Sequence, residues 1–307
     1  MPISGLIRTI ISLYLIMLAG VGMVKTGIFS RQDSVLISKL VLYVVMPCLI
    51  ISAYSNNSAE HVQKGLLLAF IAAIAVHILF LLISAFLRKF NFSGLERACI
   101  IYSNSGNFVI PIIYIMFGSE YVVYCTAFIS VQNLLIWSHG KSLILGDRTF
   151  DWKKAFCNIN IFSTLIGMAI FFSGVKLLPE LVNSLDMVAK CVAPLTMIIT
   201  GMLLADLKIE SFRQYPKIFP LVVWRLLIVP FLTLLLLRFF PVSLGLENAG
   251  KILLISLFSA MAPPANTVMM MAQIYGKDAF YVNVVSVVST ILCIFSMPLM
   301  VWIYQTL

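Results

Sequence analysis

Two hydrophobic stretches, one in each half of the chain, are interrupted by polar residues and proline. The first interruption reads SNSGNFVIP over residues 103–111, and the second reads APPANT over residues 262–267. Proline has no backbone N–H and its ring clashes with the preceding turn, so a helix that contains it kinks or opens. Backbone groups freed inside a bilayer are tolerated only where they are buried in protein or line a watery cavity. Two such breaks in corresponding positions are typical of the substrate site of a secondary transporter.

The composition is that of a membrane protein. Of the 307 residues, 61% are hydrophobic and 11% are charged. A soluble globular protein carries about a quarter charged residues. The chain is therefore predicted to be an all-α polytopic membrane protein embedded in a lipid bilayer.

Ten segments are long and apolar enough to cross a bilayer, which takes about twenty residues. They are residues 7–24, 35–54, 65–87, 98–117, 121–145, 159–175, 187–204, 218–237, 252–274 and 280–304. Residues 115–120 resemble residues 273–278, and both stretches follow a broken helix. An odd number of crossings per repeat inverts the second copy, so we predict a five-plus-five inverted repeat with crossing fourth and ninth helices. The repeats would be residues 1–145 and 159–307, with a cytoplasmic linker at 146–158.

The net charge of +9 follows from the connections between these segments. With ten crossings, fourteen Lys and Arg fall on one side of the membrane and six on the other. Cytoplasmic loops carry the excess of Lys and Arg. This places both termini outside the cytoplasm, in a multi-pass protein of the inner membrane, and gives no reason to expect a nucleic-acid partner.

The first break supplies candidate substrate-binding residues. Four of them are consecutive and polar or flexible, and a proline follows: Asn104, Ser105, Gly106, Asn107 and Pro111. Asn offers two donors and two acceptors, and Gly lets a backbone approach a ligand closely. Opened half-helices also point N–H groups with partial positive charge at an anion. The alternative is that these small and polar residues only hold neighbouring helices together.

The second break adds Pro263, Pro264, Asn266 and Thr267. A double proline at this depth indicates a crossover that lines a cavity, although a simple kink is the alternative. If the two breaks cross at one point, Asn104, Asn107 and Asn266 come together.

Three further polar residues lie inside the predicted spans. Gln132 and Asn133 in the fifth segment would either complete a polar cavity or bond to a neighbouring helix. Arg225 in the eighth would either bind an anion or extend to the nearby cytoplasmic face, and in the second case Arg225→Lys should be tolerated. Acidic residues are almost absent from the spans, and the six cysteines are scattered singly, so no metal or cofactor site is expected.

Three stretches resemble the auxin efflux carrier family, within the bile acid/sodium symporter-like superfamily. They are residues 39–50, the NSGNFVIP stretch from Asn104 to Pro111, and the APPANT stretch with its continuation to Gly276. Val109 stands where the family usually has Gly, and the adjacent Pro263 and Pro264 are a second departure.

The resemblance covers essentially the whole chain and implies more than the residues alone. It implies a scaffold of helices one, two, six and seven, and a transport unit of helices three to five and eight to ten. It implies elevator-type transport of a small organic anion, either a carboxylate or an auxin-like indole acid, by a homodimer. The positions of Asn104, Pro111 and Pro263 match family site residues.

Two other function classes compete with this interpretation. One is an intramembrane enzyme, but the chain has no G-x-S-x-G motif, paired membrane aspartates or metal-binding pattern. The other is a membrane sensor without transport, for which no soluble signalling domain is visible. The chain is therefore expected not to be an enzyme.

Overall fold

The computed structural model describes residues 3–55, 59–146, 159–205, 215–240, 245–246 and 248–307. Within these ranges the chain is helical apart from connections and one isolated β-bridge. Seven of the described helices are long and apolar enough to cross a membrane, and three shorter apolar helices accompany them. The chain is thus an all-α polytopic membrane protein, as predicted.

The first half contains five of the predicted spans. Its elements are α1 (Ile3–Lys25), η1 (Arg31–Asp33), α2 (Ser34–Leu40), η2 (Val41–Val45), α3 (Met46–Ser55), α4 (Ala59–Leu87), η3 (Arg88–Phe90), α5 (Gly94–Ile101), η4 (Ser105–Val109), α6 (Ile110–Phe117), α7 (Ser119–Leu135), η5 (Ile136–Gly140) and α8 (Lys141–Leu145). The fourth predicted span is broken into α5 and η4–α6, at the position that the sequence indicated. The linker predicted at 146–158 lies, after Gly146, outside the described residues.

The second half contains the other five predicted spans. Its elements are α10 (Ile159–Ser173), α11 (Pro179–Ala189), α12 (Val192–Leu204), α14 (Ile218–Val223), η6 (Trp224–Ile228), α15 (Val229–Arg238), α16 (Ala249–Met261), α17 (Asn266–Ile274) and α18 (Ala279–Thr306). The ninth predicted span is broken into α16 and α17. The seventh was predicted to begin at Met187, but helix already begins at Pro179, a favourable first helical position for proline. A turn at Lys190 and Cys191 separates α11 from α12.

Wide π-helical turns precede three of the prolines. The turns η2, η4 and η6 are followed, after one intervening residue, by Pro47, Pro111 and Pro230. A proline cannot donate to the carbonyl four residues earlier and its ring clashes with it. In each case that carbonyl lies inside the π turn, which gives the ring room without ending the helix.

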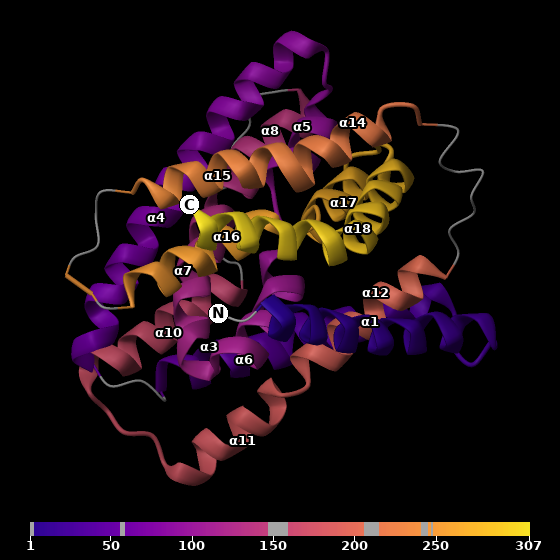
Figure 1. Cartoon of the computed structure of the whole chain (residues 1–307). Helices are drawn as coiled ribbons and strands as arrows, with labels where there is room; N and C mark the ends of the chain where they lie inside the picture. Colours follow the sequence, from indigo (N-terminus) through magenta and orange to yellow (C-terminus); the bar gives the residue numbers. More distant parts are fainter. Residues whose placement is uncertain (1–2, 56–58, 147–158, 206–214, 241–244, 247) are drawn as a thin grey trace.

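Helices α1 and α12 lie side by side (Figure 1). Their backbones approach closely through glycine. A Cβ added to Gly20 would fall on the carbonyl oxygen of Ile198, and one added to Gly201 would fall on that of Met17. Helix pairs in membranes depend on such small residues, because the lipid supplies no hydrophobic force that would drive helices together.

We expect Gly20→Ala to destabilise the protein and Gly22→Ala, on the same helix, to leave it unchanged or slightly stabilised. A Cβ at Gly20 must push α12 away, and overpacking of this kind costs about 1–3 kcal/mol. A Cβ at Gly22 meets no atom within 4 Å. Thermal unfolding of the two variants in the same detergent measures the difference. Equal transition temperatures would show that the α1–α12 contact is looser than described.

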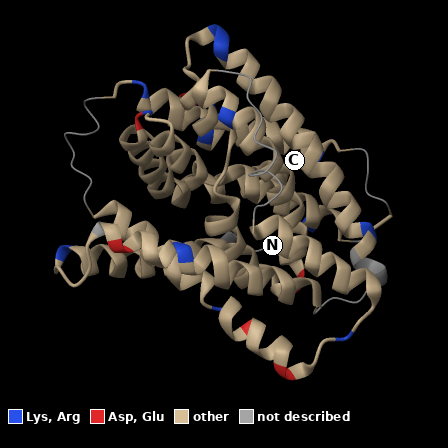
Figure 2. Ribbon diagram, turned by 180° about the vertical axis from the view of Figure 1, so that it is seen from behind, with Lys and Arg blue, Asp and Glu red and all other residues tan. Residues whose placement is uncertain are grey.

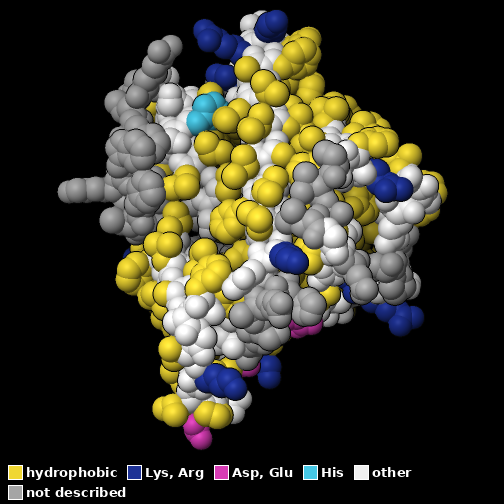
Figure 3. All heavy atoms as spheres, turned by 90° about the vertical axis from the view of Figure 1, so that its left-hand side faces the viewer, with side chains coloured by type: hydrophobic (Ala, Val, Ile, Leu, Met, Phe, Trp, Pro, Cys, Tyr) yellow, Lys and Arg dark blue, Asp and Glu magenta, His cyan; other side chains and the backbone are white. Residues whose placement is uncertain are grey.

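The remaining helices pack in two groups. Helix α3 packs on α10 and α11, beside the α1–α12 pair, and also contacts α7. The second group consists of α4, α5, α7, α14, α15, α16, α17 and α18, which pack mainly on one another. Most charged residues lie at helix ends and in connections (Figure 2). On the face drawn in Figure 3, hydrophobic side chains spread across the middle and most Lys and Arg lie toward the margins. This is the surface expected of a protein whose solvent is lipid.

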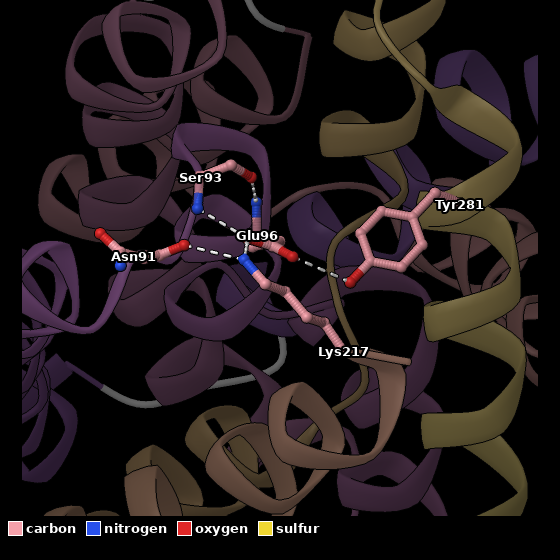
Figure 4. A network of polar contacts seen from close by, with 5 residues as sticks. All are labelled: Asn91, Ser93, Glu96, Lys217 and Tyr281. Carbon is pink, nitrogen blue, oxygen red and sulfur yellow. Dashed lines mark hydrogen bonds and ion pairs between the residues drawn. The ribbon is translucent and has the colours of Figure 1, made fainter. Parts of the chain in front are cut away.

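A polar network joins the beginnings of three helices of the second group (Figure 4). Ser93 and Glu96 form a reciprocal cap at the start of α5, and Glu96 is only 6% exposed. The Glu96 carboxylate accepts a hydrogen bond of 3.3 Å from the Tyr281 hydroxyl of α18 and lies 3.7 Å from the Lys217 ammonium before α14. Lys217 also donates to the Asn91 carbonyl oxygen at 2.9 Å. These contacts tie α5, α14 and α18 together at one end.

Candidate functional site

The two broken helices cross at their breaks. Between the half-helices, residues 102–104 and 262–265 run antiparallel and form the isolated bridge between Ser103 and Pro264. The Asn104 N–H donates to the Pro263 carbonyl oxygen at 2.8 Å, and the Ala265 N–H donates to that of Tyr102 at 2.9 Å. The two segments therefore pair some of the backbone N–H and C=O groups that the helix breaks leave free, as a structure inside a bilayer requires.

Gln132 on α7 satisfies the other edge of the first break. Its amide nitrogen donates to the Ser103 carbonyl oxygen at 2.8 Å, while its amide oxygen accepts from the Ser103 N–H at 2.9 Å and from the Ser103 hydroxyl at 2.8 Å. One side chain thus pairs with both backbone groups of an extended residue. Ser105 adds a link across the crossing, since its hydroxyl lies 2.6 Å from that of Ser103 and donates to the Ser259 carbonyl oxygen at 3.3 Å.

Arg225 lies beneath the crossing with no exposed surface. Its Nε donates to the Ala262 carbonyl oxygen at 2.8 Å, Nη2 donates to the same oxygen, and Nη1 donates to the Ile100 carbonyl oxygen at 2.7 Å. These carbonyls belong to the C-terminal ends of α16 and α5. One guanidinium therefore neutralises the negative ends of both half-helices. The expectation that Arg225 extends to the cytoplasmic face is wrong, because free carbonyls at the crossing give the guanidinium better partners than the interface does.

The N-terminal ends of η4 and α17, which carry partial positive charge, have no charged partner of this kind. Asn104 stands at the N-cap of η4 and Ala265 at the N-cap of α17, and neither helix start is capped by a side-chain hydrogen bond. Helix N-termini carry about half a positive charge each in their unpaired N–H groups. At the crossing, Arg225 thus compensates the helix C-termini, whereas the helix N-termini remain without a side-chain cap.

A hollow lies against these open N-termini. It has about 420 Å³ of empty space, the open mouth included. Its wall combines residues of the crossing with residues of α12 and α18: Asn104, Phe108, Thr200, Leu203, Pro263, Pro264, Asn266, Met269, Asn283, Ser286, Val287 and Thr290. None of these lining residues is charged. Polar recognition in the hollow therefore rests on amides, hydroxyls and helix ends.

Comparison with known families agrees with this architecture. A family model described as membrane transport protein matches residues 6–149 and 147–301, nearly the whole chain. The chain belongs to this membrane transport protein family. It is the auxin efflux carrier family that the sequence motifs resemble, so that resemblance is confirmed. A search of the curated proteins finds no match.

The hollow of this transporter contains four of the residues that the sequence singled out. Asn104, Pro263, Pro264 and Asn266 line it together. Asn107, which we expected beside Asn104 and Asn266, is not among the lining residues.

The other candidates lie elsewhere. Ser105 and Gln132 hold the crossing, and Arg225 neutralises the helix ends behind it. Gly106 and Thr267 are half-buried outside the wall of the hollow. Pro111 lines a second hollow between α3, α6 and the α11–α12 bend, and Asn133 is 9% exposed with an Nδ2 that has no partner.

Sequence reasoning missed the residues that α12 and α18 contribute. Thr200, Asn283, Ser286 and Thr290 lie in helices without a break at that point, so no interruption drew attention to them. The signal that was available is the spacing of Asn283, Ser286 and Thr290, which places polar groups on one face of a membrane helix. No group of three or more His, Cys, Asp or Glu that could hold a metal ion occurs among the described residues.

Proposed function

We propose that this transporter moves a small organic anion across the inner membrane, with the carboxylate held between the opened half-helices. The observation that supports it is the charge arrangement at the crossing. Arg225 compensates both helix C-termini, while the N-termini at Asn104 and Ala265 remain uncapped beside the hollow. An anion in the hollow meets net positive potential and several neutral donors.

The arrangement of helices supports an elevator-type movement. The hollow lies between the crossing, α18 and α12, so its wall comes from both packing groups. The scaffold in this proposal is the group of α1, α2–α3, α10 and α11–α12, and the transport unit is the rest. The Glu96 network supports a transport unit that moves as one body, because it joins α5, α14 and α18. The proposal includes ten crossings in an inverted repeat and a homodimer.

Uptake by the purified protein in proteoliposomes tests the proposal. Radiolabelled lactate, malate and indole-3-acetate are offered outside, with choline as a cationic comparison and protein-free liposomes as the control. We expect saturable uptake of at least one of the acids and none of choline. Uptake of choline alone would contradict an anion site.

We expect this uptake not to require sodium. Carbonyl oxygens at the ends of broken helices are the groups that coordinate Na⁺ in many transporters. Here the carbonyls of Ile100 and Ala262 already accept hydrogen bonds from Arg225, whose positive charge takes the place of a cation. The measurement is uptake with all external Na⁺ replaced by K⁺. A loss of more than tenfold would show that a sodium site exists elsewhere.

The predicted orientation is tested by labelling of single cysteines. If both termini are extracytoplasmic, a cysteine introduced into the 147–158 connection of a Cys-free variant should be protected from an impermeant maleimide in intact cells. A cysteine placed after Thr306 should react in the same cells. The reverse pattern would invert the topology, and permeabilised cells provide the control for reactivity.

A further inference from the structure

Helix α18 presents a polar stripe to the hollow. Asn283, Ser286, Val287 and Thr290 are spaced by three and four residues, so they share one face of the helix. All four line the hollow, on a wall formed by α18 that adjoins Asn104 and Asn266 of the crossing.

Two donors on this stripe are buried without a partner. Asn283 is 2% exposed, and its Nδ2 has no hydrogen bond. The Ser286 hydroxyl is likewise buried and unpaired. Buried polar groups are normally paired, and one left unpaired needs an explanation.

Packing within the helix does not explain them. A serine or threonine in a helix commonly satisfies its hydroxyl on the carbonyl four residues earlier. Thr290 does so, donating to the Ser286 carbonyl oxygen at 2.8 Å, but Ser286 does not. The two free donors point to an acceptor that enters the hollow from outside the protein.

We propose that Asn283 and Ser286 bind a second oxygen function of the substrate, a hydroxyl or keto group carried by the same molecule as the carboxylate. This inference rests on the proposed function. The carboxylate occupies the helix N-termini at Asn104 and Asn266, and its neutral oxygen substituent faces α18. A second carboxylate fits this wall less well, because no lining residue offers a compensating charge and an uncompensated buried charge is costly. The substrate class is therefore hydroxy and keto monocarboxylates.

Calorimetry on the detergent-purified transporter tests the proposal with matched acids. The probes are lactate, pyruvate and propionate, and 3-hydroxybutyrate, acetoacetate and butyrate. We expect the oxygenated acids to bind about tenfold more tightly than the plain acid of the same length, which is near the upper end for one hydrogen bond between neutral groups. Asn283→Leu keeps the side-chain size and should remove most of this preference, chiefly by weakening the oxygenated acids. Ser286→Ala should reduce the preference by a smaller factor.

Ser289→Ala is the matched control. Ser289 carries another buried hydroxyl without a partner on α18, but it does not line the hollow, so its loss should leave the preference unchanged. If Asn283→Leu does not yield monodisperse protein, Asn283→Ser and Ser286→Ala replace it. The measurement is again the ratio of the affinities for the oxygenated and the plain acid.

The outcomes separate this inference from the function on which it rests. Plain acids that bind as tightly as oxygenated ones, or a preference that survives the variants at both positions, would overturn the role of α18 alone. Failure of every carboxylate to bind would overturn the anion site as well. Loss of the preference at Asn283 and Ser286, with the Ser289 variant unchanged, would establish the second subsite.

Discussion

Arg225→Lys is expected to destabilise the transporter by about 2–3 kcal/mol and to abolish transport, although it keeps the charge. Hydrogen bonds to a charged group are worth about 1.5–3 kcal/mol each. The guanidinium of Arg225 reaches the carbonyls of both Ile100 and Ala262 in one planar fork, whereas an ammonium is a compact point charge that cannot reproduce this geometry. At least one buried helix end is then left unpaired. Arg225→Met loses both partners and should be worse, with little folded protein recovered.

Arg238 provides the matched comparison, because it is an arginine at the end of α15, the helix that continues from η6, and it also donates to a backbone carbonyl. Its Nη2 donates to the Leu307 carbonyl oxygen at 2.8 Å, but the contact is exposed. Arg238→Met should therefore change stability by less than about 0.5 kcal/mol. Thermal unfolding and proteoliposome uptake of the variants at both positions give the measurement. Wild-type stability and uptake in Arg225→Lys would show that charge alone suffices at the crossing, and the electrostatic basis of the proposed anion site would have to be revised.

The breaks themselves were predictable from the sequence because their cause is local. The proline pair at 263 and 264 cannot continue an ordinary helix, and the polar residues from Ser103 to Asn107 mark the first break. Pro111 lies beyond that break, where the π turn η4 accommodates its ring within the helix. The meeting of Asn104 and Asn266 in one hollow agrees with the expected crossing. Asn107, three residues after Asn104, lies outside the hollow because the turn that follows the break is a π turn, whose different periodicity alters which side chains share a face.

The role of Arg225 was not predictable in the same way. Its partners are backbone carbonyls 37 and 125 positions away, and every residue has a carbonyl, so no pattern of side chains marks them. The sequence indicates how deep Arg225 lies in the membrane but not which helix ends converge there. Extension of its side chain to the cytoplasmic face was therefore a reasonable alternative. Asn283 and Ser286 were missed for a related reason. They lie in an unbroken helix, and only the packing of α18 against the crossing distinguishes them from polar residues that hold helices together.

Asn104→Ala and Asn266→Ala are each expected to weaken substrate binding by about 10- to 100-fold while the protein stays monodisperse. Both side chains line the hollow beside uncapped helix N-termini, where an amide can donate to a bound carboxylate. Losing one bond to a charged group costs about 1.5–3 kcal/mol, and each 1.4 kcal/mol is a factor of ten in affinity. Neither residue is needed for the crossing through its side chain, since the contacts there are made by backbone groups and by Gln132.

Asn107→Ala is the matched control for this pair, because it makes the same change in the same break at a residue that does not line the hollow. Calorimetry with the best substrate from the uptake panel measures all three variants. We expect Asn107→Ala to bind with nearly wild-type affinity. Equal losses in all three would mean that the substitutions act through the shape of the broken helix. Unchanged affinity in Asn104→Ala and Asn266→Ala would show that these asparagines only hold helices together, and the carboxylate would then have to be bound by the helix N–H groups without them.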